Sequence, residues 1–424
     1  MLKQLRKLLG IIGPGFVTGA ADDDPSGVAT YSQTGAIFGF SQLWLALFTF
    51  PFMVVIQQMC GRIGMVTGKG LAGVIRAHYP KPVLYFAVSL LVVANTVNIG
   101  ADLGAMATSA QMLLGLPFLV WLCLMTGFII ALEVFVTYQT YSKILKYLAL
   151  TLFAYVLTAF IAKPDWGIIQ RSTVLPKIQF SGDYLLNVVA ILGTTISPYL
   201  FFWQASQEVE EEIEDDKIAD MGVGKPKVTR QNVTNMDLDT IVGMFFSQAI
   251  MFFIIITTAA TLHANGITKI DTASQAAEAL RPVAGDLAYL LFAAGIIGIG
   301  LLAVPILAGS SAYAVAETAG LKAGLGKTAR VAPGFYAVIA ASTLIGMLIS
   351  WLGIDPIRAL YYAAALNGLV APPLMALIIL IAANNAIMGR FVTRRIGNIV
   401  GWAIVLVMAV AGVSLILDLI VGPL

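Results

Sequence analysis

Long uninterrupted apolar runs constrain this chain more than any other feature of its sequence. Two of them are FLVWLCLMTGFIIALEVFV (118–136) and GWAIVLVMAVAGVSLILDLIV (401–421). A helix needs about 20 mainly apolar residues to cross the hydrocarbon core of a bilayer. Spanning segments must also satisfy their own backbone hydrogen bonds, as helices do. The chain is therefore predicted to be an all-α, polytopic membrane protein in contact with the lipid bilayer.

The composition excludes several other classes of protein. Of the 424 residues, 59% are hydrophobic and 11% are charged, whereas about a quarter of the residues in a soluble domain are charged. A formal net charge of +2 is too small to indicate a nucleic-acid partner, and no protein partner is evident. Cys60 and Cys123 fall in separate apolar segments and are interpreted as packing residues, without a disulfide or a metal site.

About eleven transmembrane helices are expected when a span is set at about 20 residues. They cover 11–39, 42–66, 83–113, 115–137, 144–163, 183–212, 237–263, 284–318, 330–352, 356–385 and 397–420. The first, sixth, eighth and tenth are longer than a straight span requires, so they are expected to tilt, break or protrude.

Basic residues between the spans predict the orientation, because cytoplasmic loops are enriched in lysine and arginine. One loop, 163–183, carries basic residues on the opposite side, but the basic residues of the other loops outnumber them. We expect a multi-pass protein of the cell (inner) membrane with its N-terminus in the cytoplasm and its C-terminus outside. The basic residues that support this are Lys3, Arg6, Lys7, Arg62, Lys69, Arg76, Lys81, Lys143, Lys146, Lys322, Lys327, Arg330, Arg390, Arg394 and Arg395.

An acidic run followed by a short basic one, QEVEEEIEDDKIADMGVGKPKVTRQ (207–231), comes after the sixth span. Two interpretations stay open for it. A charge run is ordinarily a solvated helix end and linker. The second interpretation is an acidic vestibule that concentrates cations near an exit.

Two of the spans contain helix-breaking residues near their centres. The first holds Pro25 and Gly27, and the sixth holds Gly193, Ser197 and Pro198. Proline removes a backbone donor and clashes with the preceding turn, and the freed groups are costly in lipid unless they line a cavity. Two broken helices five spans apart match a transporter built from two inverted repeats. The predicted division is a first repeat at 1–182 (helices 1–5), a second repeat at 183–388 (helices 6–10) and an extra helix 11 at 389–424.

Three aspartates, Asp22, Asp23 and Asp24, stand at the first break. Ionisable groups inside a membrane usually mark an ion path, and carboxylate and carbonyl oxygens together suit a hard divalent cation. Asp24 lies about 20 Å into its span, at about 1.5 Å per residue. The competing interpretation places the aspartates at the aqueous end of the span. It stays open mainly for Asp22 and Asp23, because consecutive helix positions face different ways.

These motifs occur in an order that resembles the Nramp divalent-metal transporters. Segment 13–40 resembles their first helix, whose signature is Asp-Pro-Gly-Asn, and ILGTTISPYLFFWQ (191–204) resembles their sixth, with Met-Pro-His at its centre. GRIGMVTGKGLA (61–72), GADLGA (100–105) and RALYYAAALNGLVAPPL (358–374) resemble the end of their second helix and their third and tenth helices. The resemblance covers nearly the whole chain and implies that a divalent metal ion is the transported substrate, with no cofactor.

The resemblance also implies which residues form the metal site. The family's aspartate, asparagine, carbonyl-donating alanine and methionine correspond to Asp24, Gly27, Thr194 and Ser197. Further residues of a cavity or relay are Asp22, Asp23, Asn98, Asp102 and Tyr199, of which Asn98 and Asp102 share one helix face. For Asn98, hydrogen bonding between helices is the alternative role. Tyr199 and Gln204 replace family histidines, Ala364 replaces a glutamine and Ala105 replaces a glutamate.

The departures from the family pattern shape the predicted function. Loss of the methionine leaves oxygen donors, which suit Mg²⁺ and Mn²⁺ better than soft metals. Glycine and serine in place of asparagine and methionine predict a wider site, which suits a partly hydrated Mg²⁺. The pattern is similar to the Nramp-related magnesium transporters. The main prediction is import of Mg²⁺, and also Mn²⁺, by alternating access with weak or no proton coupling.

Three other functions compete with this prediction. The first is proton-coupled Mn²⁺/Fe²⁺ symport, but the family's histidines are gone, and His78 and His263 are expected in solvated loops. The second is transport of amino acids or other organic solutes, which needs a pocket for an anionic carboxylate that Asp24 would repel. The third is a membrane hydrolase that uses Asp24 and Asp102, for which the sequence shows no substrate recognition. No enzymatic activity is therefore predicted.

Overall fold

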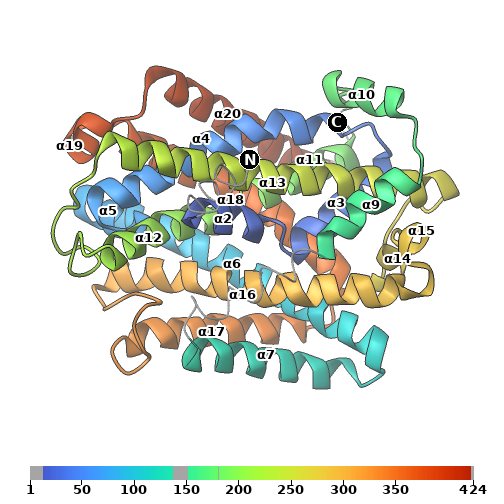
Figure 1. Ribbon diagram of the computed structural model, residues 1–424, viewed down its shortest axis with the longest axis horizontal. Helices are drawn as coiled ribbons and strands as arrows, with labels where there is room; N and C mark the ends of the chain where they lie inside the picture. Colours follow the sequence, from blue (N-terminus) through green and yellow to red (C-terminus); the bar gives the residue numbers. More distant parts are fainter. Residues whose placement is uncertain (1–12, 137–150, 180, 422–424) are drawn as a thin grey trace, which may run out of the picture.

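Figure 1 shows the computed structural model, which describes residues 13–136, 151–179 and 181–421. Regular structure in these ranges is helical, which confirms the predicted all-α class. Outside the described residues lie five of the basic residues used to predict orientation: Lys3, Arg6, Lys7, Lys143 and Lys146.

The longer helices run along the long axis of the molecule, with short helices at both ends (Figure 1). Their bounds are α2 Pro14–Asp22, α3 Pro25–Phe38, α4 Trp44–Thr67, α5 Leu71–His78, α6 Lys81–Leu114, α7 Phe118–Phe135, α9 Phe153–Ile161, α10 Trp166–Val174, α11 Gly182–Thr195, α12 Pro198–Glu214, α13 Arg230–Thr261, α14 Ala273–Glu278, α15 Arg281–Ala284, α16 Ala288–Ala319, α17 Pro333–Ser350, α18 Pro356–Ala382, α19 Asn385–Met388 and α20 Arg395–Val421.

Nine segments of the described chain are long and apolar enough to cross a membrane. Two of the predicted spans account for the difference from eleven. The first span is divided into α2 and α3, and each half is too short to count as a crossing. Of the fifth span, 144–163, only the part from residue 151 onward lies within the described residues, where it forms α9.

Both predicted helix breaks are present, and local chemistry explains where they fall. Asp24 separates α2 from α3, and Ser197 separates α11 from α12; both have extended backbone conformations. Pro25 and Pro198 begin the second half of each pair. Proline is favoured in the first turn of a helix and pushes the preceding residue away from helical geometry.

The two broken helices lie in the interior of the bundle. In Figure 1, α2, α3 and α12 run between a layer that contains α4, α13 and α20 and another that contains α16, α17 and α7. Helix α13 packs along α2, α3 and α4, while α11 packs along α18 and α6 along α16. Large apolar side chains are exposed on the outer helices α7 and α20, as expected for contact with lipid. Cys123, expected to pack internally, lies exposed on α7.

Close contacts between glycines hold the broken helices against their neighbours. A Cβ atom at Gly19 of α2 would lie 2.3 Å from the carbonyl oxygen of Gly243 in α13. Small residues at such positions let helix backbones approach closely in membranes. The first turn of α2 is held by the same neighbour, because the carboxylate of Asp239 accepts hydrogen bonds from the amides of Gly13 (3.0 Å), Gly15 (2.7 Å) and Phe16 (3.3 Å).

Candidate cation site at the helix breaks

Asp24 is held in the interior by its role as the N-cap of α3. Its Oδ1 atom accepts hydrogen bonds from the amide of Gly27 (2.7 Å) and the hydroxyl of Ser26 (2.6 Å). Its Oδ2 atom accepts a hydrogen bond from Asn98 Nδ2 (3.0 Å), on α6. Aspartate is favoured at this cap because its short side chain reaches the free amides of the first turn. The side chain is 1% exposed, so Asp24 lies in the protein interior.

Asn98 connects Asp24 to two further helices. Its Nδ2 atom lies 3.4 Å from Asp102 Oδ2, and its Oδ1 atom accepts a hydrogen bond of the same length from Asn367 of α18. Asn98 thus forms hydrogen bonds between helices, and one of them is to the central carboxylate itself. Asp102 Oδ1 and the single side-chain oxygen of Asn367, Oδ1, are buried and have no hydrogen-bond partner in the described structure. Two oxygen donors therefore remain free for a ligand beside Asn98.

For Asn367, which stands ahead of Gly368, Pro372 and Pro373, the sequence left open whether it marks a hinge or contributes to the site. A polar side chain in the apolar helix α18, directly before Gly368, was the available signal. Its contact with α6 depends on how two distant helices pack, which residue spacing along the chain does not reveal.

Ser197 uses its hydroxyl group at the second break. The Oγ atom donates toward the carbonyl oxygens of Gly193 (2.6 Å) and Thr194 (2.9 Å), two groups near the end of α11. The Thr194 hydroxyl lies 3.4 Å from that of Ser26, next to Asp24. The Thr194 hydroxyl of the second break therefore lies beside the first break.

Gly27 does not leave the predicted wider site in this conformation. A Cβ atom at this position would lie 3.3 Å from each of three atoms: the carbonyl oxygen of Asp22, the hydroxyl oxygen of Thr194 and a ring carbon of Tyr31. The space that an asparagine side chain would need is occupied by these groups. The expectation of extra room at residue 27 is therefore wrong here, because Tyr31 packs back over the break.

Tyr199 connects the two breaks. Its hydroxyl group donates a hydrogen bond to the carbonyl oxygen of Ala21 (2.8 Å), in the last turn of α2. The helix ends at Asp22, so this carbonyl has no regular partner further along α2. The residue was assigned to a cavity or relay, and in this structure its hydroxyl satisfies a backbone group freed by the break.

Asp22 and Asp23 are buried with Asp24, so their alternative placement at an aqueous helix end is wrong. They face α13, where Ser247 Oγ lies 2.5 Å from Asp22 Oδ2 and 3.4 Å from Asp23 Oδ1. One oxygen of each carboxylate has no hydrogen-bond partner in the described structure. Three buried carboxylates thus adjoin the break, Asp24 toward α6 and the other two toward α13.

The carboxylates do not converge on one point. Among the described residues, no group of three or more His, Cys, Asp or Glu side chains is arranged to hold a metal ion. A cation at this break would therefore need neutral oxygen donors in addition to carboxylate. The side chains that contact Asp24 and Asp102 provide hydroxyl and amide groups and no sulfur or imidazole.

A buried line of polar side chains runs from α2 along one face of α12. Thr18 Oγ1 donates to Gln204 Oε1 (2.5 Å), and Gln204 Nε2 donates to Glu208 Oε1 (2.8 Å). Glu208 Oε2 is buried without a described hydrogen-bond partner. Glu212, one turn later, is buried and paired with Lys217 (3.1 Å). The interpretation of segment 207–231 as a solvated linker is therefore wrong at Glu208 and Glu212, because both side chains lie on α12 and are buried inside the protein.

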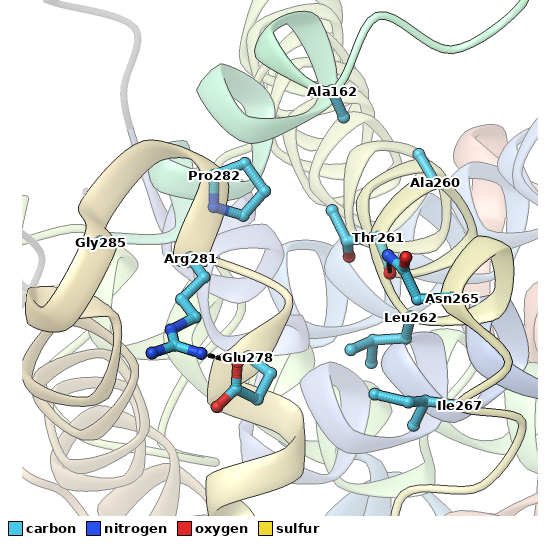
Figure 2. Close-up of a pocket in the computed structure, with 10 residues that line it drawn as sticks. All are labelled: Ala162, Ala260, Thr261, Leu262, Asn265, Ile267, Glu278, Arg281, Pro282 and Gly285. Atoms are coloured by element: carbon cyan, nitrogen blue, oxygen red, sulfur yellow. Dashed lines mark hydrogen bonds and ion pairs between the residues drawn. The ribbon is translucent and has the colours of Figure 1, made fainter.

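A separate cavity of about 580 Å³ lies at the far end of α13 and contains none of the predicted site residues. Figure 2 shows Arg281 and Pro282 on one side of it and Thr261 and Asn265 on the other, with Arg281 paired to Glu278. His78 and His263 are exposed at helix ends, as expected. The residues around this cavity and the two histidines therefore take no part in the site at the breaks.

Comparison with known proteins finds the same family over nearly the whole length of the chain. A family model described as natural resistance-associated macrophage protein-like (Nramp) matches residues 15–418. The chain is 26% identical over 427 residues to the divalent metal cation transporter MntH of Deinococcus radiodurans, covering 99% of this chain and 92% of that protein. It is 28% identical over 421 residues to MntH of Klebsiella pneumoniae (strain 342), covering 98% and 95%.

Solved structures with the same fold include two kinds of transporter. A manganese transporter of Eremococcus coleocola, in complex with an aromatic bis-isothiourea compound, superposes with a TM-score of 0.75 at 16% identity, over 98% of this chain and 88% of that one. Mhp1, a nucleobase-cation-symport-1 family transporter in a closed conformation, gives a TM-score of 0.59 at 13% identity, over 97% and 91%. The likeness to both is one of fold.

Proposed function

This chain belongs to the Nramp family of divalent metal cation transporters, and from that premise we propose that it binds a hard divalent cation where its two broken helices meet. The cation is the substrate, and it crosses by alternating access as one part of the bundle moves against the other. Residues 1–182 and 183–388 form the two inverted repeats in this proposal, with 389–424 as the additional helix. The protein lies in the cell membrane with its N-terminus in the cytoplasm.

Burial of Asp22, Asp23 and Asp24 is the observation that supports this proposal most directly. Their described hydrogen bonds come from hydroxyl, amide and backbone groups, and none comes from a lysine, arginine or histidine. A buried carboxylate without a compensating charge is strongly unfavourable. A bound cation supplies that charge, and this makes the break a binding site.

The proposed ligand set is centred on Asp24 and the second break. Asp24 supplies the charged ligand, and Thr194 and Ser197 supply carbonyl and hydroxyl oxygens from the second break. Gly27 contributes no side chain, and its amide orients Asp24. Asn98 and Asp102 do not contact the cation directly in this proposal, and they hold water molecules that are bound to it. Asp22, Asp23 and Tyr199 fix the end of α2 on the opposite side.

Two cations are candidates for the substrate. The relatives favour Mn²⁺, the ion of the alternative proton-coupled symporter, since they are named divalent metal cation transporters and a solved structure of this fold is described as a manganese transporter. Mg²⁺ is supported by the donor set alone, because Ser197 stands where the family has methionine, and oxygen ligands suit both ions. For coupling, Tyr199 and Gln204 offer no imidazole, whereas Asp102 keeps a buried carboxylate that can carry a proton.

An enzymatic role finds no support at this site. A hydrolase with paired aspartates needs two carboxylates that face the same bond. Here Asn98 lies between Asp24 and Asp102 and donates to both.

Uptake into proteoliposomes, with internal pH recorded, tests the proposal. We expect Mn²⁺ and Mg²⁺ to enter above the rate of protein-free vesicles, with Cd²⁺ a poor substrate. Acidification that follows Mn²⁺ entry supports the coupled symporter, and Mg²⁺ entry at constant internal pH supports the uncoupled transporter. Absence of uptake for every divalent cation offered would contradict the proposal.

Ser197→Met is expected to shift selectivity toward soft cations. The thioether adds a ligand that prefers Cd²⁺ over Mg²⁺, so the ratio of Cd²⁺ to Mg²⁺ uptake should rise by about tenfold, which is about 1.4 kcal/mol. Competition between the two ions in the same vesicles measures this ratio.

Ser197→Leu is the matched control for that change. It has similar bulk without sulfur, and it loses the same hydrogen bonds to the carbonyls of Gly193 and Thr194. An equal shift in both variants would mean that size, and not sulfur, changed the selectivity, and would remove Ser197 from the ligand set.

A further inference from the structure

The largest of the cavities described in the structure lies away from the helix breaks. It has a volume of about 720 Å³ and is formed where α4, α13 and α20 come together with the residues before α20. None of the residues assigned to the cation site lines it. Helix α13 and helix α20 both begin beside it, at Arg230 and Arg395.

Positive charge dominates one end of this cavity. Arg62, Arg230, Arg390 and Arg394 line it, against the single carboxylate of Asp237. Asp237 is already bound by Arg62 through two contacts of 3.0 and 3.2 Å. An excess of cationic side chains therefore remains without a carboxylate partner.

The four arginines differ in how they are held. Arg390 donates to the carbonyl oxygen of Val228 (3.0 Å) and lies over the ring of Phe391. In the described part of the chain, the guanidinium groups of Arg230 and Arg394 form no hydrogen bond or ion pair, although Arg394 lies close enough to Asp237 for their charges to interact. Guanidinium groups bind phosphate oxygens in pairs of parallel hydrogen bonds, so phosphate is the anion that this geometry suits.

Apolar side chains form the rest of the cavity wall. They are Val55, Met59, Val233, Ile396 and Val400. The wall continues onto the outer surface, where Ile396 is 76% exposed and Phe245 of α13 is 63% exposed. A free phosphate ion needs no such surface, whereas the acyl chain of a lipid does.

We propose that this cavity binds the phosphate headgroup of an anionic phospholipid, with Arg230 and Arg394 as the main contacts and the acyl chains along α13 and α20. Basic pockets between membrane-spanning helices are suited to anionic headgroups. Exposed apolar side chains of α13 and α20, Phe245 and Ile396, are where we expect the acyl chains to lie. The proposal is independent of which cation the protein carries.

Thermal unfolding of the full chain in a neutral detergent tests this proposal. Addition of phosphatidylglycerol is expected to raise the unfolding midpoint by several degrees, as ligand binding to the folded state does. Phosphatidylcholine with the same acyl chains is expected to give no more than a small rise. Native mass spectrometry should retain phosphatidylglycerol on the protein.

The double variant Arg230→Gln and Arg394→Gln is expected to lose the phosphatidylglycerol effect and the bound lipid. Arg171→Gln with Lys177→Gln removes the same charge from two exposed positions, one in α10 and one just after it, and should keep both. If the first variant does not fold, the comparison of the two lipids on the unaltered protein still decides. Equal effects of the two lipids, an effect retained in the double variant, or an equal effect of inorganic phosphate alone would each overturn the assignment to lipid.

Discussion

Asp24→Asn is expected to reduce divalent cation uptake to the rate of protein-free vesicles. Asparagine keeps the size of the side chain and an oxygen that can accept from Gly27 and Ser26, so the cap of α3 is preserved. It removes the negative charge that opposes the cation. Removing one partner of a buried ion pair costs about 3–5 kcal/mol, which corresponds to a loss of at least about 100-fold in binding. Uptake of Mn²⁺ and Mg²⁺ over a range of concentrations measures the loss.

Asp286→Asn is the control for that variant. It removes the same charge from a side chain that is fully exposed at the other end of the molecule, and its uptake should match the unaltered protein. Unfolding midpoints of both variants should stay near that of the parent. Uptake by Asp24→Asn within twofold of the parent would show that the cation does not depend on this carboxylate.

Gly193→Ala is expected to have the largest effect on stability. A Cβ atom there would lie 2.0 Å from the carbonyl oxygen of Ala364 and 2.2 Å from the amide nitrogen of Gly368. Both atoms belong to the backbone of α18, so no side chain can turn away to make room. Overpacking of an interior costs about 1–3 kcal/mol and sometimes more. We expect a clear fall in the unfolding midpoint and loss of monodisperse protein in size-exclusion chromatography.

The same substitution at Gly127 provides the comparison. Gly127 lies inside α7, and a Cβ atom there would meet nothing within 4 Å. Alanine is the better helix former by about 1 kcal/mol, so Gly127→Ala should leave the midpoint unchanged or raise it. A Gly193→Ala protein as stable as Gly127→Ala would mean that α11 and α18 are further apart than described here.

Local chemistry let the sequence predict the spans and both breaks. Apolar runs define spans by length alone, and a proline within such a run marks where the helix stops. Asp24 was singled out because an ionisable group at a break inside a membrane span usually marks an ion path. The beginning of α13 was predicted less well. The apolar pattern starts at 237, whereas the helix begins at Arg230 with a capping box formed by Thr229 and Asn232.

Contacts between distant segments were the part that the sequence did not reveal. Ser247 beside Asp22 and Asn367 beside Asn98 are separated from their partners by more than 200 residues. The error at Gly27 has the same origin. A missing side chain suggested empty space, but Tyr31 and Thr194 fill it in the packed bundle. The free volume at a site depends on every side chain and backbone group that surrounds it. The identity of a single residue therefore does not predict that volume.

The attachment of α2 to α13 has a mechanical consequence. The first turn of α2 is fixed by Asp239, and its middle is pressed against Gly243. A swing of α2 on its own would break three hydrogen bonds and separate two backbones in contact. We therefore expect α2 to move together with the first part of α13. Helix α13 begins at Arg230, which lines the arginine-rich cavity. A ligand bound in that cavity would therefore contact the same helix that holds α2 in place.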